Sequence, residues 1–201
     1  MTPYDELAAL DPALEPVLTA TGRPDPFAWP DHGRTGGDLF AAMVLHISGQ
    51  QISTVMAFRL YDGLAREVGG IPDAAGVAAL APERWRALGF SHAKQAYLTE
   101  LARRCRTGEL DLAALAGLPD DQVRAALTAL PGVGRWTSEM FLIFQLHRPD
   151  VFPAGDAGLR RAVGRWLPPA GTSVPEVEAR SAIWTPYRTY AAAALWHSLA
   201  L

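Results

Sequence analysis

A glycine-containing turn between two predicted helices is the first feature of this sequence that could do chemistry. The string Leu-Pro-Gly-Val-Gly at 130–134 follows an amphipathic pattern over 119–130 and precedes a helical pattern over 135–146. Two glycines one residue apart allow a tight reversal, and their backbone, which lacks Cβ atoms, can touch a ligand. Because a helix begins directly after the turn, its free amides and positive dipole end would face that ligand. The string therefore predicts a hairpin that binds a phosphate, with an ordinary turn between helices as the alternative.

The elements that would position this hairpin are all predicted to be helical. Thr2-Pro3 opens a short helix that ends near Leu10, and apolar residues recur at helical spacing over 38–48 and 53–68. Further helices are predicted to begin at Asp73, at Pro82, at Ser91 (ending near Arg106), at Asp156 (ending at Trp166) and within 175–201, where Pro186 divides two. No segment shows the strict alternation that indicates a strand. We therefore expect an all-α fold.

Composition suits a globular protein and gives no overall charge signal. The 201 residues are 49% hydrophobic and carry a net charge of −3, so any nucleic-acid contact must come from local arrangement. No apolar run is long enough to cross a bilayer and no secretory signal is visible, so we expect a cytoplasmic protein. A single cysteine, Cys105, excludes an intramolecular disulfide and a four-cysteine metal site. The histidines show no metal-ligand spacing, so no transition metal is assigned.

Several strings, the hairpin among them, resemble the helix-hairpin-helix (HhH-GPD) DNA glycosylases, and in particular their 3-methyladenine DNA glycosylase II (alkylation-repair) branch. The other strings are 48–53, 89–94, 150–162 and 186–191, followed by Trp196, and together they span about residues 36 to 198. The resemblance implies two helical lobes, 36–132 and 1–35 with 133–201, in a single unit of residues 1–201. It places the helix-hairpin-helix motif at the cleft. The chain is expected to depart from larger bacterial relatives in one respect, because the short segment before Gly37 cannot encode their N-terminal β-sheet domain.

By the same resemblance, Asp156 is the catalytic carboxylate, because the superfamily places an aspartate at a helix N-terminus roughly twenty residues after the hairpin. It would stay ionised, stabilise the cationic sugar as the base leaves, and orient or deprotonate the attacking water. The alternative is a helix N-cap worth about 1 kcal/mol, and the two roles are compatible. Members that also cut the strand carry a lysine where this chain has Trp136, and Lys94 is its only lysine. We therefore expect a monofunctional hydrolase without lyase activity.

The resemblance also implies which residues meet the DNA. Trp136 and Trp196 match walls of the base pocket, where an indole would hold a cationic methylated base by about 0.5–2 kcal/mol, and Met140 replaces a third, aromatic wall. Core packing is the alternative for both tryptophans. DNA contacts are expected at Gly132, Val133, Gly134, Thr137, Gln50, Gln51 and His92. Backbone carbonyls of Thr128, Leu130 and Val133 could hold a monovalent cation, and no other cofactor is expected.

The implied function is excision of flipped-out alkylated bases, of the 3-methyladenine and 7-methylguanine type, leaving an abasic site in base excision repair. The expected partner is damaged double-stranded DNA, and the expected state is a monomer that associates with the nucleoid through DNA. Two other functions stay open. A module that binds DNA without catalysis would not need Asp156 or a pocket. An enzyme of the endonuclease III type would need the cysteines and the lysine that this sequence lacks.

Overall fold

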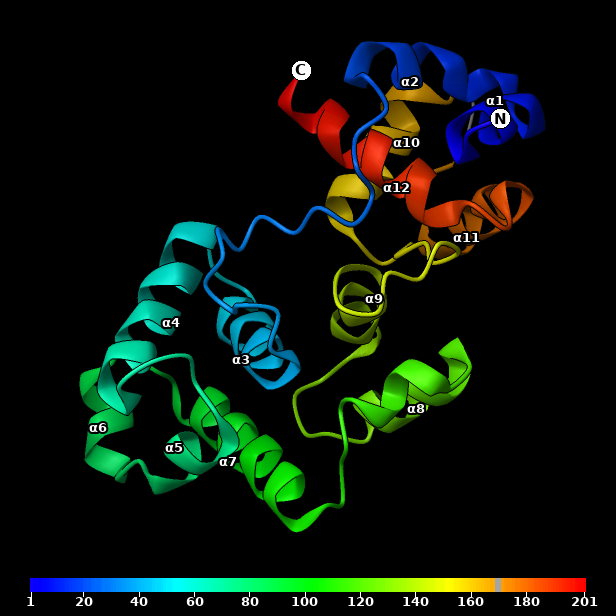
Figure 1. Ribbon diagram of the computed structural model, residues 1–201. Helices are drawn as coiled ribbons and strands as arrows, with labels where there is room; N and C mark the ends of the chain where they lie inside the picture. The colour runs from blue at the N-terminus through cyan, green and yellow to red at the C-terminus, as the bar shows by residue number, and fades with distance from the viewer. Residues whose placement is uncertain (169–170) are drawn as a thin grey trace. The chain divides into compact units, whose positions relative to one another are not determined.

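The computed structural model describes residues 1–168 and 171–201 and confirms the all-α fold (Figure 1). No strand occurs among these residues. The chain divides into two compact units, which we call the central unit (29–141) and the terminal unit (1–28 with 142–201). The expected boundaries were 35/36 and 132/133. The hairpin and residues 135–141 fall in the central unit, where Gln50 donates to the Gly132 carbonyl and the Tyr97 ring packs against Gly132.

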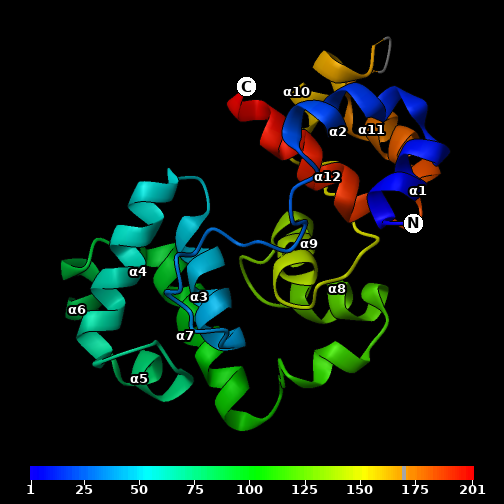
Figure 2. The same ribbon diagram turned by 45° about the horizontal axis from the view of Figure 1, so that its top comes forward.

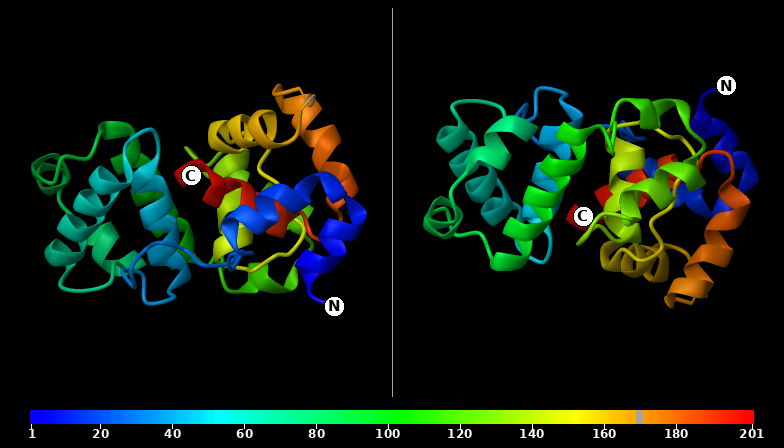
Figure 3. Two further views of the ribbon diagram at one scale, coloured as in Figure 1. Left: turned by 90° about the horizontal axis from the view of Figure 1, so that it is seen from above. Right: turned by 90° about the horizontal axis from the view of Figure 1, so that it is seen from below.

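The central unit is built around one buried helix. Its helices are α3 (Leu39–Gly49), α4 (Thr54–Val68), α5 (Ala74–Ala79), α6 (Pro82–Ala87), α7 (His92–Thr107), η2 (Ala114–Gly117) and α8 (Asp120–Thr128). Residues 40–48 of α3 are all buried, as expected for a helix that is apolar on every face. Helices α4 and α7 both pack against α3, and Figure 3 shows this group from two opposite sides. The C-terminal end of α3, which leads into Gln50, is therefore firmly held.

Local side-chain caps explain where these helices begin. In α3, α4, α5 and α7 the residue before the helix accepts a hydrogen bond from the backbone amide three residues later; these caps are Asp38, Ser53, Asp73 and Ser91. Such caps satisfy amides that have no partner within the helix. Helices α4 and α7 end at Gly69 and Gly108, both in the left-handed conformation that glycine adopts without strain. The helix starts predicted for this unit are confirmed.

The terminal unit surrounds helix α12. Its helices are α1 (Pro3–Leu10), η1 (Pro12–Leu14), α2 (Glu15–Thr21), α10 (Ala157–Trp166), α11 (Val174–Ser181), η3 (Ala182–Trp184), α12 (Arg188–His197) and η4 (Ser198–Ala200). Residues 191–195 of α12 are buried, and α1, α2 and α10 pack against this helix (Figure 2). Four of the five buried residues are alanines, so neighbouring backbones can approach closely. Asp11 ties the unit together by accepting a hydrogen bond from Trp184 Nε1 at 2.7 Å and by pairing with Arg180.

Two further features complete the architecture. Helix α9 (Arg135–Phe144) follows the hairpin, and its residues 135–141 belong to the central unit and 142–144 to the terminal unit.

Helix α2 was not predicted, because Pro12 and Pro16 make its surroundings look like a loop. Proline is tolerated in a first helical turn, and the buried Val17 and Leu18 then anchor the helix. Within the described part of the chain, no helix is long and apolar enough to cross a membrane.

Candidate active site

The hairpin is closed by contacts that require one of its glycines. Gly132 has a φ of 78°, and a Cβ atom added there would lie 2.1 Å from the Tyr97 ring. Val133 is buried, and its amide donates to the Leu130 carbonyl at 3.1 Å. At Gly134, in contrast, an added Cβ would meet no atom within 4 Å. Gly132 therefore shapes the turn, and Gly134 leaves its backbone open to a ligand.

Helix α9 starts at the hairpin in a way that suits an anion. The Ser138 amide donates to the Gly134 carbonyl at 3.1 Å, which places Gly134 at the helix N-terminus. The backbone amides of residues 135–137 lie in the first turn of α9, at the positive end of the helix dipole. Backbone amides at a helix N-terminus are a common phosphate site. Gly134 and the first turn of α9 are thus compatible with the predicted phosphate site, which stays a prediction, whereas the Val133 amide closes the turn.

The two glutamines that follow α3 have different environments. Gln50 Nε2 donates to the Gly132 carbonyl at 2.8 Å and to Thr137 Oγ1 at 3.1 Å. Thr137 is 3% exposed, so its hydroxyl faces the protein interior. Gln51 is exposed and has a φ of 60°, a left-handed conformation that is uncommon for residues other than glycine. Strained backbone of this kind often occurs where a side chain must be presented to a ligand.

Asp156 occupies the predicted position at the start of α10. Its Oδ1 accepts a hydrogen bond from the Leu159 amide at 2.8 Å and another from Trp196 Nε1 at 3.3 Å. The group is half-buried, and the space beside it is restricted, because a Cβ on Gly158 would lie 3.0 Å from Oδ1. Trp196 in turn stacks on Phe144, with ring centroids 6.0 Å apart and planes at 26°. The carboxylate is therefore an N-cap whose orientation an indole also fixes.

Trp136 lies in the first turn of α9 and is 40% exposed. It lines a cavity of about 260 Å³ in the central unit together with Trp29, His46 and Phe58. The Trp29 and His46 rings are stacked, with centroids 4.6 Å apart and planes at 19°. Burial lowers the pKa of His46 to about 4, so the imidazole is neutral near pH 7. A neutral, aromatic wall suits a planar ligand, including a cationic one.

Trp29 and His46 were not singled out by sequence analysis. Trp29 lies in a stretch rich in proline and glycine, and His46 lies on an apolar helix where a lone histidine is usually structural. The remaining predicted residues have simple environments. Met140 is 4% exposed within α9, and His92 is an exposed first residue of α7. The Leu130 carbonyl accepts from the Val133 amide and keeps a second lone pair.

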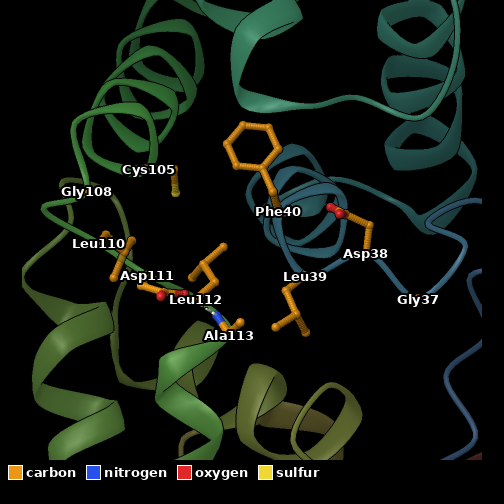
Figure 4. A pocket seen from close by; sticks show the side chains of 10 residues that line it. All are labelled: Gly37, Asp38, Leu39, Phe40, Cys105, Gly108, Leu110, Asp111, Leu112 and Ala113. Carbon is orange, nitrogen blue, oxygen red and sulfur yellow. Dashed lines mark hydrogen bonds between the residues drawn. The ribbon is translucent and has the colours of Figure 1, made fainter.

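A cavity of about 500 Å³ elsewhere in the central unit lacks reactive groups (Figure 4). Asp38 and Asp111 reach it from different walls, but Asp38 accepts a hydrogen bond from one backbone amide of its own segment and Asp111 from two. Burial raises the pKa of the Cys105 thiol in this cavity to about 11, so the thiol stays protonated and is a poor nucleophile. The described residues also contain no cluster of three His, Cys, Asp or Glu side chains that could hold a metal ion.

Known proteins resemble this chain in sequence and in fold. Residues 44–186 match the family model described as HhH-GPD superfamily base excision DNA repair protein. The chain is 30% identical over 169 residues to YfjP of Bacillus subtilis, a protein named for DNA-3-methyladenine glycosylase activity, covering 80% of this chain and 59% of that protein. A DNA-3-methyladenine glycosidase from Bacillus halodurans is 28% identical with a TM-score of 0.82, covering 98% of this chain and 89% of that one. The 3-methyladenine DNA glycosylase Mag1 of Schizosaccharomyces pombe, in complex with abasic DNA, is 27% identical with a TM-score of 0.85, covering 100% and 98% of the two chains.

The hairpin followed directly by α9, within an all-α fold, defines a helix-hairpin-helix protein. The family-model match covers most of the chain, and the chain belongs to the HhH-GPD superfamily of base excision DNA repair proteins. It spans about three fifths of the length of the B. subtilis relative.

Proposed function

We propose that this chain is a monofunctional DNA glycosylase that excises alkylated bases of the 3-methyladenine and 7-methylguanine type. The observation that carries the proposal is the Asp156 carboxylate, which a helix cap and Trp196 Nε1 orient in a chain of the base-excision superfamily. The names of the B. subtilis, B. halodurans and S. pombe relatives support the substrate class. A protein that only bound DNA would use this carboxylate as a helix cap alone.

The proposed reaction breaks the bond between C1′ of the sugar and the base nitrogen. The base leaves with the bonding electron pair, and its departure is easy because alkylation has already made it cationic. Asp156 stabilises the positive charge that develops on the sugar and accepts a proton from the attacking water. The water oxygen forms the new bond to C1′, and the products are a free base and an intact strand with an abasic site.

Binding precedes this step and uses other residues. The amides around Gly134 and the first turn of α9 hold a phosphate of the duplex without reading its sequence. A base must leave the stack before hydrolysis, and aromatic side chains stabilise the extruded base. Trp196 beside Asp156 and Trp136 in the central unit each offer an indole face, and the cation–π attraction of either is worth about 0.5–2 kcal/mol.

We propose that the chain has no lyase activity because of where its single lysine lies. A lyase in this superfamily needs a lysine where this chain has Trp136. The only lysine, Lys94, donates from Nζ to the Ser48 carbonyl at 2.6 Å. No Schiff base is therefore expected between a lysine and the abasic sugar.

Two finer points belong to the same proposal. The carbonyls of Thr128, Leu130 and Val133 would hold a monovalent cation at the hairpin, where such a charge would favour a nearby phosphate. The second lone pair on the Leu130 carbonyl is compatible with this role.

We also propose that the protein acts as a monomer on DNA of the nucleoid.

A base-release assay on duplexes with defined lesions tests the proposed function. Wild-type protein should release free 3-methyladenine or 7-methylguanine and leave a strand that breaks only after alkali or heat. Borohydride should trap no covalent adduct. A trapped adduct would mean that another amine, such as Lys94 or the N-terminus, acts as a lyase nucleophile. No release of any alkylated base would contradict the proposed substrate class.

A further inference from the structure

The start of helix α7 contacts the hairpin and the end of α3, the helix that leads into Gln50 and Gln51. Lys94 and Tyr97 are three residues apart on this helix and therefore lie on the same face. Lys94 Nζ donates to the Ser48 carbonyl at 2.6 Å, next to the turn that carries Gln50 and Gln51. The Tyr97 ring fills the space where a Cβ of Gly132 would lie, directly against the hairpin. One face of α7 thus contacts both the hairpin and the helix end that precedes the glutamine turn.

Gln50 joins these two segments to each other. Its amide nitrogen donates to the Gly132 carbonyl and to Thr137 Oγ1, 82 and 87 residues further along the chain. Both partners can accept, which fixes the side-chain nitrogen as the donor. The Gln50 amide is therefore already bound within the protein, whereas the neighbouring Gln51 is exposed.

The contact made by Lys94 also fits the electrostatics of a helix end. Ser48 is in the last turn of α3, where the carbonyls carry the negative end of the dipole, and a positive charge there is stabilising. Partial burial lowers the pKa of Lys94, which indicates that the ammonium group is drawn away from solvent. The lysine is placed to hold the end of α3 and not to project into solvent.

We propose that Gln50 and Lys94 are positioning residues which, together with Tyr97, form a brace between the Gln51 turn and the hairpin. The brace keeps the two segments at a fixed spacing, so that a phosphate bound at the hairpin sets where Gln51 meets the duplex. In this account Gln50 reads no base, and Lys94 contacts no phosphate. The inference rests on the proposed DNA-glycosylase function, but it concerns binding and base extrusion and not the hydrolysis step.

The test for Lys94 is the salt dependence of duplex binding. Each phosphate contact contributes about −0.9 to the slope of log K against log salt concentration. Lys94→Met should leave this slope unchanged while reducing base extrusion, followed by 2-aminopurine fluorescence, about ten- to a hundredfold. Lys94→Arg, which keeps the charge and a donor, should recover part of the loss. A slope that is less steep by about one unit would show a phosphate contact and overturn the proposal.

The test for Gln50 is a double-mutant cycle in the same extrusion assay, with Gln50→Met, Thr137→Val and the double variant. Residues that act through one contact give non-additive effects, so the double variant should extrude the base about as well as the worse single variant. Gln51→Met is the matched control at the neighbouring glutamine. Its effect on base extrusion should be additive with that of Thr137→Val. Additive effects for Gln50→Met and Thr137→Val, or unchanged extrusion in Gln50→Met, would overturn the brace.

Both tests measure duplex binding and base extrusion, so their results do not depend on hydrolysis of the glycosidic bond. A wild-type protein that extrudes the base without releasing it would contradict the proposed hydrolysis and leave the brace to be judged by its own variants. Denaturant unfolding of each variant separates a loss of extrusion from a loss of folded protein. A variant whose extrusion falls only in proportion to its folded fraction would count against the brace.

Discussion

Gly132→Ala is the substitution whose cost follows most directly from the structure. A residue with a Cβ in the left-handed conformation at this φ of 78° loses about 1–2 kcal/mol. The new Cβ would also lie 2.1 Å from Cδ2 and 2.4 Å from Cγ of Tyr97. Cγ is the ring atom bonded to the Tyr97 Cβ, so rotating the ring does not remove this contact. Such overpacking costs about 1–3 kcal/mol. The free energy of unfolding should therefore fall by about 2–5 kcal/mol.

Gly134→Ala is the matched control, since its Cβ would meet no atom within 4 Å. Its free energy of unfolding should change by no more than about 0.5 kcal/mol. The added methyl group covers the backbone that a phosphate would approach, so affinity for undamaged and damaged duplex should fall together. Urea unfolding and fluorescence anisotropy at fixed salt measure the two quantities. The reasoning is refuted if Gly132→Ala is as stable as wild type, or if Gly134→Ala binds duplex normally.

Three further predictions concern single side chains. Burial lowers the pKa of His46 from 6.5 to about 4, so the unfolded chain gains a proton before the folded one as the pH falls. The free energy of unfolding should therefore drop by about 2 kcal/mol between about pH 7 and pH 5, and denaturant unfolding of His46→Phe should lack this part of the pH dependence. Trp196→Phe keeps a ring for stacking but loses the hydrogen bond to Asp156, so single-turnover base release should slow about tenfold, and an unchanged rate would show that the indole does not orient the carboxylate. Asp11→Ala leaves the buried Trp184 Nε1 and the Arg180 guanidinium without their carboxylate, and thermal or urea unfolding should show a loss of about 3 kcal/mol.

Helix starts and the hairpin could be predicted from the sequence because they depend on neighbouring residues. Asp73, Ser91 and Asp156 each accept a hydrogen bond from an amide three residues ahead, so the signal and its partner lie in one short string. The same locality made α2 hard to predict. Pro16 within α2 and Pro12 before it are typical of a loop, and the burial of Val17 and Leu18 in the terminal unit favours a helix.

Long-range partners could not be predicted from the residues alone. Gln50 was expected near the minor groove, but its amide is bound to Gly132, 82 residues away, and nothing in the local string indicates that contact. Trp29 and His46 form a stacked pair because tertiary packing brings a loop residue against α3. Sequence reasoning favoured a structural role for a lone histidine such as His46. The burial of His46 beside the cavity, which keeps its imidazole neutral, is visible only in the structure.

The central claim is that Asp156 supplies the negative charge for hydrolysis, and Asp156→Asn tests it most directly. Asparagine keeps the shape and can still accept the Leu159 amide, so the free energy of unfolding should stay close to that of wild type. Release of 3-methyladenine or 7-methylguanine under single-turnover conditions should fall about a hundred- to a thousandfold, with affinity for damaged duplex retained. Base release by Asp156→Asn at the wild-type rate would contradict the account and leave this aspartate as a helix cap alone.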